Sequence, residues 1–188
     1  MSNSKNNSKR IAWGITGSGD YMRESVTMME KLTKKYNLDV DVYLSREGAV
    51  VLKYYKLLKE VKTNFGKVSV EKGPNAPFLS GRLQLGMYKL FLIAPATANT
   101  VAKMTHGIAD SLITNSAAQA MKADVSVYIF PVDQKECEVI TKLPDGRDLK
   151  LRTRKEDVEN VEKLRRMQGI KVLSGLDEFE AVVKELQL

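Results

Sequence analysis

The sequence has only one cysteine, Cys137, among its 188 residues. A disulfide within the chain and a zinc or iron–sulfur site built from four cysteines both need more cysteines than this, so both are excluded within one chain. Cys137 is therefore interpreted as a small apolar side chain. We expect no metal site, and any electron transfer by this protein would need an organic cofactor.

Long apolar runs are absent as well. Residues 1–10 are rich in Ser, Asn and Lys and lack the apolar core of a signal peptide, and no later stretch reaches the length that spans a membrane. We therefore expect a cytoplasmic protein without membrane association. The length favours one domain at residues 11–188, preceded by a disordered tail at residues 1–10.

The sequence also lacks a block of basic charge. Its net charge is +7, but the 30 Lys and Arg residues are spread along the chain and mixed with 23 Asp and Glu residues. Nucleic-acid binding is therefore not expected. A positive face would instead attract a small acidic redox protein, such as a ferredoxin-like iron–sulfur protein, through long-range electrostatics.

Apolar residues alternate between strand-like and helical spacing along most of the chain. The run at 88–94 is apolar without alternation, which is typical of a central parallel strand covered on both faces. The pattern predicts an α/β fold with a doubly wound parallel sheet in three layers. The predicted strands are 11–16, 40–45, 88–94, 125–130 and 170–173, and the predicted helices carry Met22 to Leu32, 49–62, a stretch from Asn99, 108–121, a stretch ending near Met167, and 177–186.

Three segments depart from this alternation. Residues 66–85 contain several Gly and Pro residues and no clear period, which predicts a long irregular connection that lines the site. Two alternating segments around Pro144-Asp145-Gly146 predict a C-terminal β-hairpin appendage at about 137–153. Residues 153–156 have the form of a capping box that opens the next helix.

The turn Gly17-Ser18-Gly19 lies between the first predicted strand and the first helix. Backbone N–H groups in such a turn, together with the positive end of the helix dipole, can hold a phosphate. The turn matches neither the full dinucleotide fingerprint nor a Walker A loop, and a turn that only reverses the chain is the alternative.

The second strand ends at Ser45. An NAD-binding domain usually has an acidic residue at this place, whereas a hydroxyl suits phosphate oxygens, so Ser45 favours a mononucleotide over NAD. Its alternative role is the N-cap of the following helix.

Small and polar residues follow the 88–94 strand directly. They are Pro95, Ala96, Thr97, Ala98, Asn99 and Thr100. Small side chains let a planar ring approach the backbone, and the hydroxyl and amide groups lie where the next helix starts. With its continuation to Asp110, this segment resembles the flavoprotein family of homo-oligomeric flavin-containing cysteine decarboxylases (HFCD family), in which a P-A-S/T-A-N-T motif binds FMN.

Within that family the sequence is most similar to the archaeoflavoproteins, through residues 12–17, 75–79, 116–121 and 158–167. The resemblance implies a flavodoxin-like (Rossmann-like) fold, FMN as cofactor, and a homotrimer or a multiple of it with FMN between subunits. The site residues that it implies are Gly17, Ser18, Gly19 and Ser45 on the phosphate side, Pro95, Ala96, Thr97, Ala98, Asn99 and Thr100 around the flavin ring, and Ser116, Ala117 and Gln119 closing the ring pocket.

One departure from the family bears on catalysis. The decarboxylating members have a histidine shortly before the strand that leads into the motif, and the matching residues 80–84 contain none. The resemblance therefore favours an oxidoreductase-type flavoprotein over a decarboxylase. His106, the only histidine, is a candidate for proton transfer or for a structural role, and Asp110 is expected to cap a helix.

Three functions fit these observations. The main hypothesis is an FMN-binding electron-transfer flavoprotein that accepts electrons from a ferredoxin-like donor. An alternative is an FMN-dependent reductase of a pterin such as dihydromethanopterin, and a second alternative is a non-catalytic binding subunit of the same family. The first two both need an exposed flavin edge, so the sequence alone leaves the choice between them open.

Overall fold

The computed structural model describes residues 9–188, so most of the expected tail lies outside the described residues. The first strand begins at Arg10, inside the predicted tail, because the Arg10 guanidinium pairs with the Asp41 carboxylate at 3.0 Å. The elements in chain order are β1 (Arg10–Ile15), α1 (Met22–Tyr36), β2 (Asp39–Leu44), α2 (Arg46–Tyr54), α3 (Leu58–Asn64), β3 (Lys67–Val70), α4 (Leu79–Gln84), β4 (Leu90–Ala96), α5 (Ala98–Thr105), α6 (Leu112–Lys122), β5 (Ser126–Pro131), β6 (Glu138–Lys142), β7 (Asp148–Arg152), α7 (Lys155–Arg165), β8 (Ile170–Val172) and α8 (Glu178–Glu185).

Within residues 9–188, six strands form one sheet in the order β3-β2-β1-β4-β5-β8, and every neighbouring pair is parallel. Without the edge strand β3, this is the strand order of flavodoxin-like proteins. The direction of winding reverses between β1 and β4. Ligands of such sheets bind outside the carboxyl ends of the strands at this reversal.

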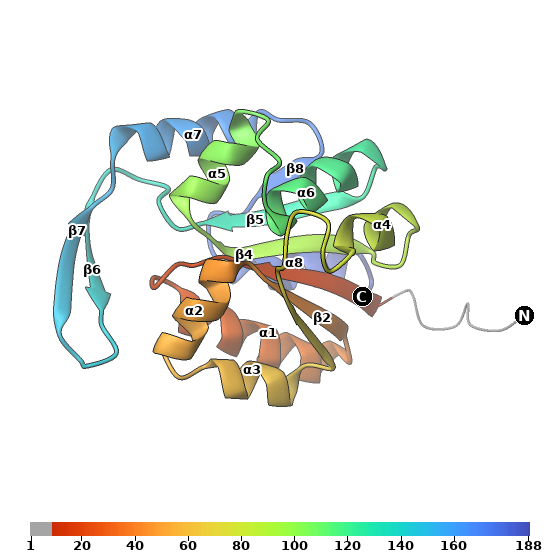
Figure 1. The fold of residues 1–188 in the computed structure, drawn as a ribbon, viewed down its shortest axis with the longest axis horizontal. Helices are drawn as coiled ribbons and strands as arrows, with labels where there is room; N and C mark the ends of the chain where they lie inside the picture. Colours follow the sequence, from red (N-terminus) through yellow and green to blue (C-terminus); the bar gives the residue numbers. More distant parts are fainter. Residues whose placement is uncertain (1–8) are drawn as a thin grey trace, which may run out of the picture.

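Helices cover both faces of the sheet, as Figure 1 shows. One core lies between the sheet and the helices α1, α2, α3 and α8, and it contains the fully buried Trp13. The other core lies between the sheet and α4, α5, α6 and α7, and it contains Phe91. Because successive residues of a strand point to opposite faces, both faces of β4 are apolar, and the predicted three-layer α/β fold is confirmed.

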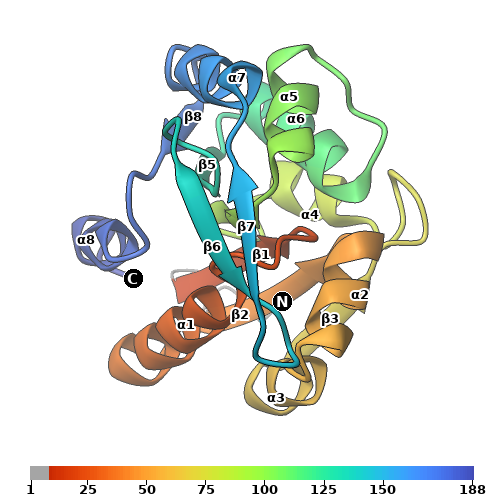
Figure 2. The same cartoon turned by 90° about the vertical axis from the view of Figure 1, so that its left-hand side faces the viewer.

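The predicted hairpin is confirmed as an antiparallel pair of β6 and β7 outside the main sheet. Figure 2 shows it in front of the sheet, running from α7 toward α3. Two hydrogen bonds fasten it to the carboxyl edge of the sheet: the Thr141 hydroxyl donates to the Asp20 carboxylate at 2.5 Å, and the Tyr55 hydroxyl donates to the Lys142 carbonyl at 3.2 Å. The hairpin therefore borders the region where a ligand is expected.

The predicted helix at 49–62 is wrong as one element, because α2 and α3 replace it. Lys56 adopts a left-handed φ of 60°, and the Leu57 N–H donates to the Leu52 carbonyl at 2.8 Å. These bonds form a Schellman motif, which ends a helix and usually has glycine at the left-handed position. The sequence has lysine there, so the break gave no glycine signal.

The predicted irregular connection at 66–85 is also partly wrong, since it contains β3 and α4. β3 is an edge strand whose residues are half-buried or exposed, and it therefore lacks a buried apolar run. α4 is short and buries Leu79 and Leu83, which are spaced four residues apart.

The predicted capping box at 153–156 is wrong. The N-cap of α7 is Arg154, and no side chain caps this helix. The Arg154 guanidinium instead binds both carboxylate oxygens of Asp157, at 2.8 and 2.6 Å. The Thr153 hydroxyl is turned to the Asp133 carboxylate, at 3.4 Å, and is therefore drawn away from the helix.

Among residues 9–188, none of the helices combines the length and the apolar character that crossing a bilayer requires.

Candidate functional site

A hollow of about 360 Å³ lies at the carboxyl ends of β1, β2 and β4, where the winding of the sheet reverses. We call it the switch-point hollow. Its lining residues are Thr16, Gly17, Ser45, Arg46, Glu47, Glu71, Thr97, Asn99, Thr100, Lys103 and Ser111. The structure thus brings together five residues predicted from the sequence, since Gly17, Ser45, Thr97, Asn99 and Thr100 come from three separate segments.

The turn after β4 is held by Thr16 at the end of β1. The Thr16 hydroxyl donates to the Pro95 carbonyl at 2.9 Å and accepts from the Thr97 N–H at 2.9 Å. The Thr16 N–H also donates to the Pro95 carbonyl, at 3.2 Å. Because Thr16 is only 2% exposed, these bonds are shielded from water and fix the turn against β1.

The N-terminus of α5 opens into the switch-point hollow. Thr97 is its N-cap, and its hydroxyl accepts from the Thr100 N–H at 3.3 Å. Asn99 is exposed, and its side chain forms no hydrogen bond with the rest of residues 9–188. The amide of Asn99 and the first N–H groups of α5 are therefore available to a ligand.

The second wall comes from the N-terminus of α2. Ser45 caps α2 by accepting from the Gly48 N–H at 2.9 Å, so its role as an N-cap is confirmed. A hydroxyl that accepts one bond still has its own O–H to donate, so Ser45 can also bind a phosphate oxygen. Gly17 packs closely against this helix, because a Cβ at Gly17 would lie 2.6 Å from the Glu47 Cβ.

Charged residues of both signs line the hollow, and the sequence analysis missed them. Lys103 lies one turn after Asn99 on α5, and its ammonium binds both oxygens of Asp110 at 2.8 and 2.9 Å. This ammonium lowers the pKa of Asp110. Helical spacing from Asn99 was the signal that would have identified Lys103.

Glu71, just after β3, joins two helices at the rim of the hollow. Its carboxylate accepts from the Arg46 N–H at 3.2 Å and from the Leu112 N–H at 3.1 Å, which are the first residues of α2 and α6. A carboxylate is stabilised at helix N-termini by the dipoles of both helices. This contact could not be predicted from the sequence, because β3 itself was not predicted.

Several implied site residues lie elsewhere. Ser18 is nearly buried, and Gly19 lines a separate hollow beside Tyr55. Pro95 and Ala96 form the end of β4, and Ala98 is half-buried at the start of α5. On α6, Ser116 and Ala117 are fully buried, the Ser116 hydroxyl has no hydrogen-bond partner within residues 9–188, and Gln119 accepts from the Gln84 amide at 3.1 Å.

His106 does not line the hollow, whereas Asp110 is bound to Lys103, which does. His106 is exposed at the far end of α5, about 10 Å along the helix from Asn99, and its Nδ1 lies 2.8 Å from the Ala102 carbonyl. Asp110 does not cap α6, because Ser111 is the N-cap and forms a capping box with Thr114. The structural interpretation of His106 fits this position.

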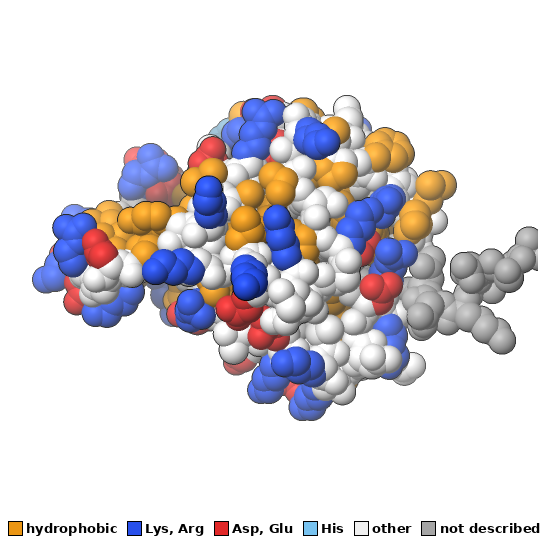
Figure 3. All heavy atoms as spheres, turned by 60° about the horizontal axis from the view of Figure 1, so that its bottom comes forward, with side chains coloured by type: hydrophobic (Ala, Val, Ile, Leu, Met, Phe, Trp, Pro, Cys, Tyr) orange, Lys and Arg blue, Asp and Glu red, His pale blue; other side chains and the backbone are white. Residues whose placement is uncertain are grey.

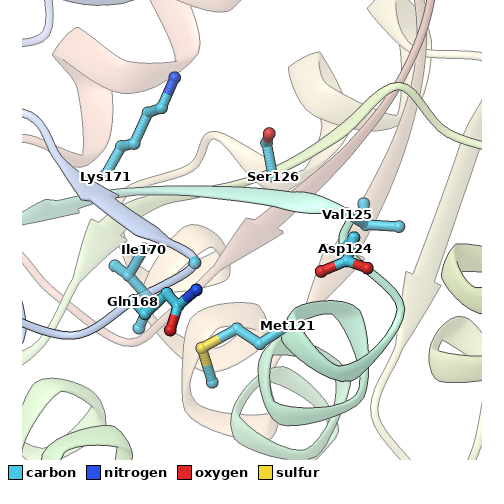
Figure 4. Close-up of a pocket in the computed structure, with 8 residues that line it drawn as sticks. Met121, Asp124, Val125, Ser126, Gln168, Ile170 and Lys171 are labelled. Carbon is cyan, nitrogen blue, oxygen red and sulfur yellow. The ribbon is translucent and has the colours of Figure 1, made fainter.

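A different hollow, of about 560 Å³, lies at the amino ends of β5 and β8. Figure 4 shows Met121 and Gln168 on one side of the strands, while Ser126 and Lys171 extend to the other side. The Lys171 ammonium is engaged by the Tyr128 hydroxyl at 3.1 Å. This hollow is at the wrong edge of the sheet for the ligand site of a doubly wound fold.

The fold is that of a doubly wound α/β protein, with a hollow at the carboxyl edge of its sheet where such folds bind ligands. The sequence profile of the Flavoprotein family matches residues 1–187, and the chain belongs to this family. The family resemblance inferred from the sequence is therefore confirmed.

Three known proteins are similar to this chain in sequence or in structure. An uncharacterized protein of Methanocaldococcus jannaschii is 58% identical over 93% of this chain and 94% of the relative. The dihydromethanopterin reductase (acceptor) of the same organism is 42% identical over 75% of this chain, which spans only 60% of that reductase. The structure of Burkholderia xenovorans DmrB with FMN, described as a cubic protein cage for redox transfer, superposes with a TM-score of 0.82 at 34% identity, covering 96% of this chain and 98% of DmrB.

Proposed function

We propose that this protein binds FMN in the switch-point hollow and uses it to reduce a pterin such as dihydromethanopterin. The proposal rests on one observation: the N-terminus of α5 and the hydroxyl of Ser45 line the same hollow. The side-chain amide of Asn99 on α5 forms no hydrogen bond within residues 9–188. The similarity to a dihydromethanopterin reductase and to the FMN complex of DmrB supports the choice of cofactor and substrate.

The residues present fit a flavin mononucleotide. On the phosphate side, Gly17 has no side chain to keep a ligand away from the backbone, and the Ser45 hydroxyl still has its O–H to donate. On the ring side, the half-buried Ala98 adds only a methyl group at the start of α5, and Asn99 supplies an amide. Ser18 and Gly19 are proposed to complete the phosphate side from the same loop.

Bound FMN would supply the electron pair for reduction of the substrate. The protein's own residues would bind and orient this group and balance its charge. The N-terminus of α5 presents positive charge to the hollow and would stabilise negative charge that develops on reduction, whereas the Lys103 ammonium is already paired with Asp110.

The electron carrier remains a second candidate, since the net charge of +7 suits an acidic donor such as a ferredoxin-like protein. The relatives favour the reductase over this main sequence-based hypothesis. If the protein were only a carrier, reduction by the acidic donor would slow strongly above about 0.1 M salt, where the Debye length is about 10 Å.

We further propose that the chain assembles into a homotrimer or a multiple of it. Exposed apolar side chains support this: Val50, Tyr54, Phe78 and Leu85 are each more than half exposed, and Figure 3 shows apolar groups between basic ones on one face. The cage described for DmrB supports it as well. Sedimentation equilibrium gives the mass, and a monomer would contradict the assembly.

The experiment for the proposed function has two readouts. Purified protein is saturated with FMN, free flavin is removed, and bound flavin is counted per chain. The flavin is then reduced chemically under argon and mixed with dihydromethanopterin. We expect one FMN per chain and formation of the tetrahydro product, whereas failure to retain FMN would refute the proposal.

A further inference from the structure

Another hollow, of about 690 Å³, lies between the hairpin, α7 and the carboxyl end of β5. We call it the hairpin hollow. Its lining residues are Asp20, Tyr21, Phe130, Val132, Asp133, Gln134, Lys135, Cys137, Val139, Thr153, Glu162, Arg165 and Ser174. Its volume is in the range of sites that bind small organic molecules. The cofactor site uses none of these residues.

The two hollows flank the same turn. β4 lies between β1 and β5 in the sheet, so its end separates the switch-point hollow from the hairpin hollow. The Thr97 N–H is bonded to Thr16 on one side, and the Ala96 carbonyl accepts from the Val132 N–H at 3.1 Å on the other side. The turn after β4 therefore borders both hollows.

Tyr21 presents an aromatic face to the hairpin hollow. It has a left-handed φ of 58°, which is uncommon for a large side chain and is a local strain that often marks functional positions. Its ring packs edge-on against Phe130, with ring centres 5.1 Å apart, yet 45% of the residue remains exposed. A planar ligand could stack on the exposed part.

Asp133 supplies an acceptor edge in the same hollow. It is half-buried, and within residues 9–188 it forms no ion pair. Its Oδ1 accepts one long hydrogen bond from Thr153, at 3.4 Å. Burial, with the charges of Asp157 and Asp20 nearby, raises the pKa of Asp133.

The other carboxylates near Asp133 are already engaged. Asp157 binds the Arg154 guanidinium through both oxygens, and Asp20 accepts from the Thr141 hydroxyl. Arg154 is drawn toward Asp157, so it lowers the pKa of Asp133 less than burial raises it. Asp133 is therefore the carboxylate that a donor-bearing ligand would satisfy.

We propose that the hairpin hollow binds the acceptor of the proposed reductase, as a planar nitrogen heterocycle that stacks on Tyr21 and donates its amino and ring N–H groups to Asp133. This inference rests on the proposed function, because it assigns the place of its substrate. An amino group beside a ring N–H, as in a pterin, offers two parallel donors to a carboxylate, in the manner of a guanidinium.

The test measures binding rather than turnover. Fluorescence titration gives the dissociation constant of 6-methylpterin on the FMN-loaded protein and on the flavin-free protein. The matched ligand is 6-methyllumazine, which has a carbonyl in place of the amino group. We expect the unmodified protein to bind the pterin about 10- to 100-fold more tightly than the lumazine, the range for a hydrogen bond to a charged group.

Two variants locate the site. Asp133→Asn should weaken pterin binding by about the same factor and remove the preference over lumazine. Tyr21→Asn removes the ring but suits the left-handed backbone, so it should weaken both ligands about equally. Asp148→Asn, an exposed carboxylate on the hairpin, is the matched control and should change neither constant. Retained FMN stoichiometry checks that each variant is folded.

Equal affinity for the two ligands in the unmodified protein would overturn the assignment, and so would unchanged pterin binding in both variants. These results are distinguishable from failure of the proposed function, because FMN stoichiometry is measured separately. One FMN per chain without pterin selectivity rejects the hairpin hollow alone, whereas absence of bound FMN rejects the reductase itself.

Discussion

Replacing Thr16 by valine tests most directly whether Thr16 holds the turn after β4 in place. Valine keeps the branched shape but removes the hydroxyl that donates to the Pro95 carbonyl and accepts from the Thr97 N–H, both at 2.9 Å. The Pro95 carbonyl retains its bond from the Thr16 N–H. The Thr97 N–H, however, loses its partner.

The expected cost follows from these bonds. A neutral hydrogen bond contributes about 1 kcal/mol, and a buried donor left unpaired costs about 1–3 kcal/mol, so Thr16→Val should lower the free energy of unfolding by about 2–4 kcal/mol. For a chain of this size, that corresponds to a fall in Tm of roughly 4–16 °C. Because the Thr97 turn borders the hollow, FMN affinity should fall at least about tenfold.

Urea unfolding, followed by the fluorescence of the buried Trp13, measures the free energy of unfolding. Trp13 reports on this region because its indole N–H donates to the Ala94 carbonyl at 2.7 Å. Flavin titration measures the FMN affinity. Thr16→Ser keeps the hydroxyl and is the control, with FMN affinity close to that of the unmodified protein. If valine lowers neither stability nor affinity, Thr16 does not hold the turn and the reasoning fails.

Three further changes have definite outcomes. Asn99→Leu removes the exposed amide and should weaken FMN binding about 10-fold or shift the flavin potential, which titration and potentiometry measure. Gly17→Ala puts a Cβ 2.6 Å from the Glu47 Cβ, so it should displace α2 and lower both Tm and FMN affinity. Lys35 lowers the pKa of Glu180 from 4.5 to about 2, so the stabilisation by this carboxylate is present above pH 4.5 and is lost as pH falls toward 2. The difference in unfolding free energy between the unmodified protein and Glu180→Gln should therefore disappear between pH 4.5 and pH 2. Unfolding at several pH values measures this difference.

The sheet and its layers were predictable because the buried strands have recognisable apolar runs in the sequence. The run Leu90–Ala94 is apolar on both faces, which is typical of a strand covered on both sides. Elements stabilised by tertiary contacts were not predictable. β3 is an edge strand without an apolar run, and the break at Lys56 uses a residue that rarely adopts a left-handed conformation.

The candidate site was predictable where residue type and position coincide. Ser45 ends one predicted strand, Thr97 and Asn99 lie in the segment that follows another, and the carboxyl ends of parallel strands meet at one edge. Lys103 and Glu71 were missed, because a charged residue on a helix or after an edge strand is usually solvated. Their role depends on which segments the fold brings together.

The hairpin hollow illustrates the same limit. Asp133 and Tyr21 are more than 100 residues apart in sequence, and nothing in the local pattern links them. The strand order places the loop after β1 near the end of β5, and the hairpin then covers both. Long-range arrangements of this kind follow from topology and not from periodicity.

The most direct test of the central claim is one anaerobic stopped-flow measurement. The FMN-loaded protein, reduced to completion, is mixed with an equimolar amount of dihydromethanopterin while flavin absorbance is recorded. We expect full reoxidation of the flavin, with one tetrahydro product formed per FMN. Flavin that stays reduced with the pterin, but is reoxidised rapidly by an iron–sulfur protein, would contradict the reductase and identify the protein as an electron carrier.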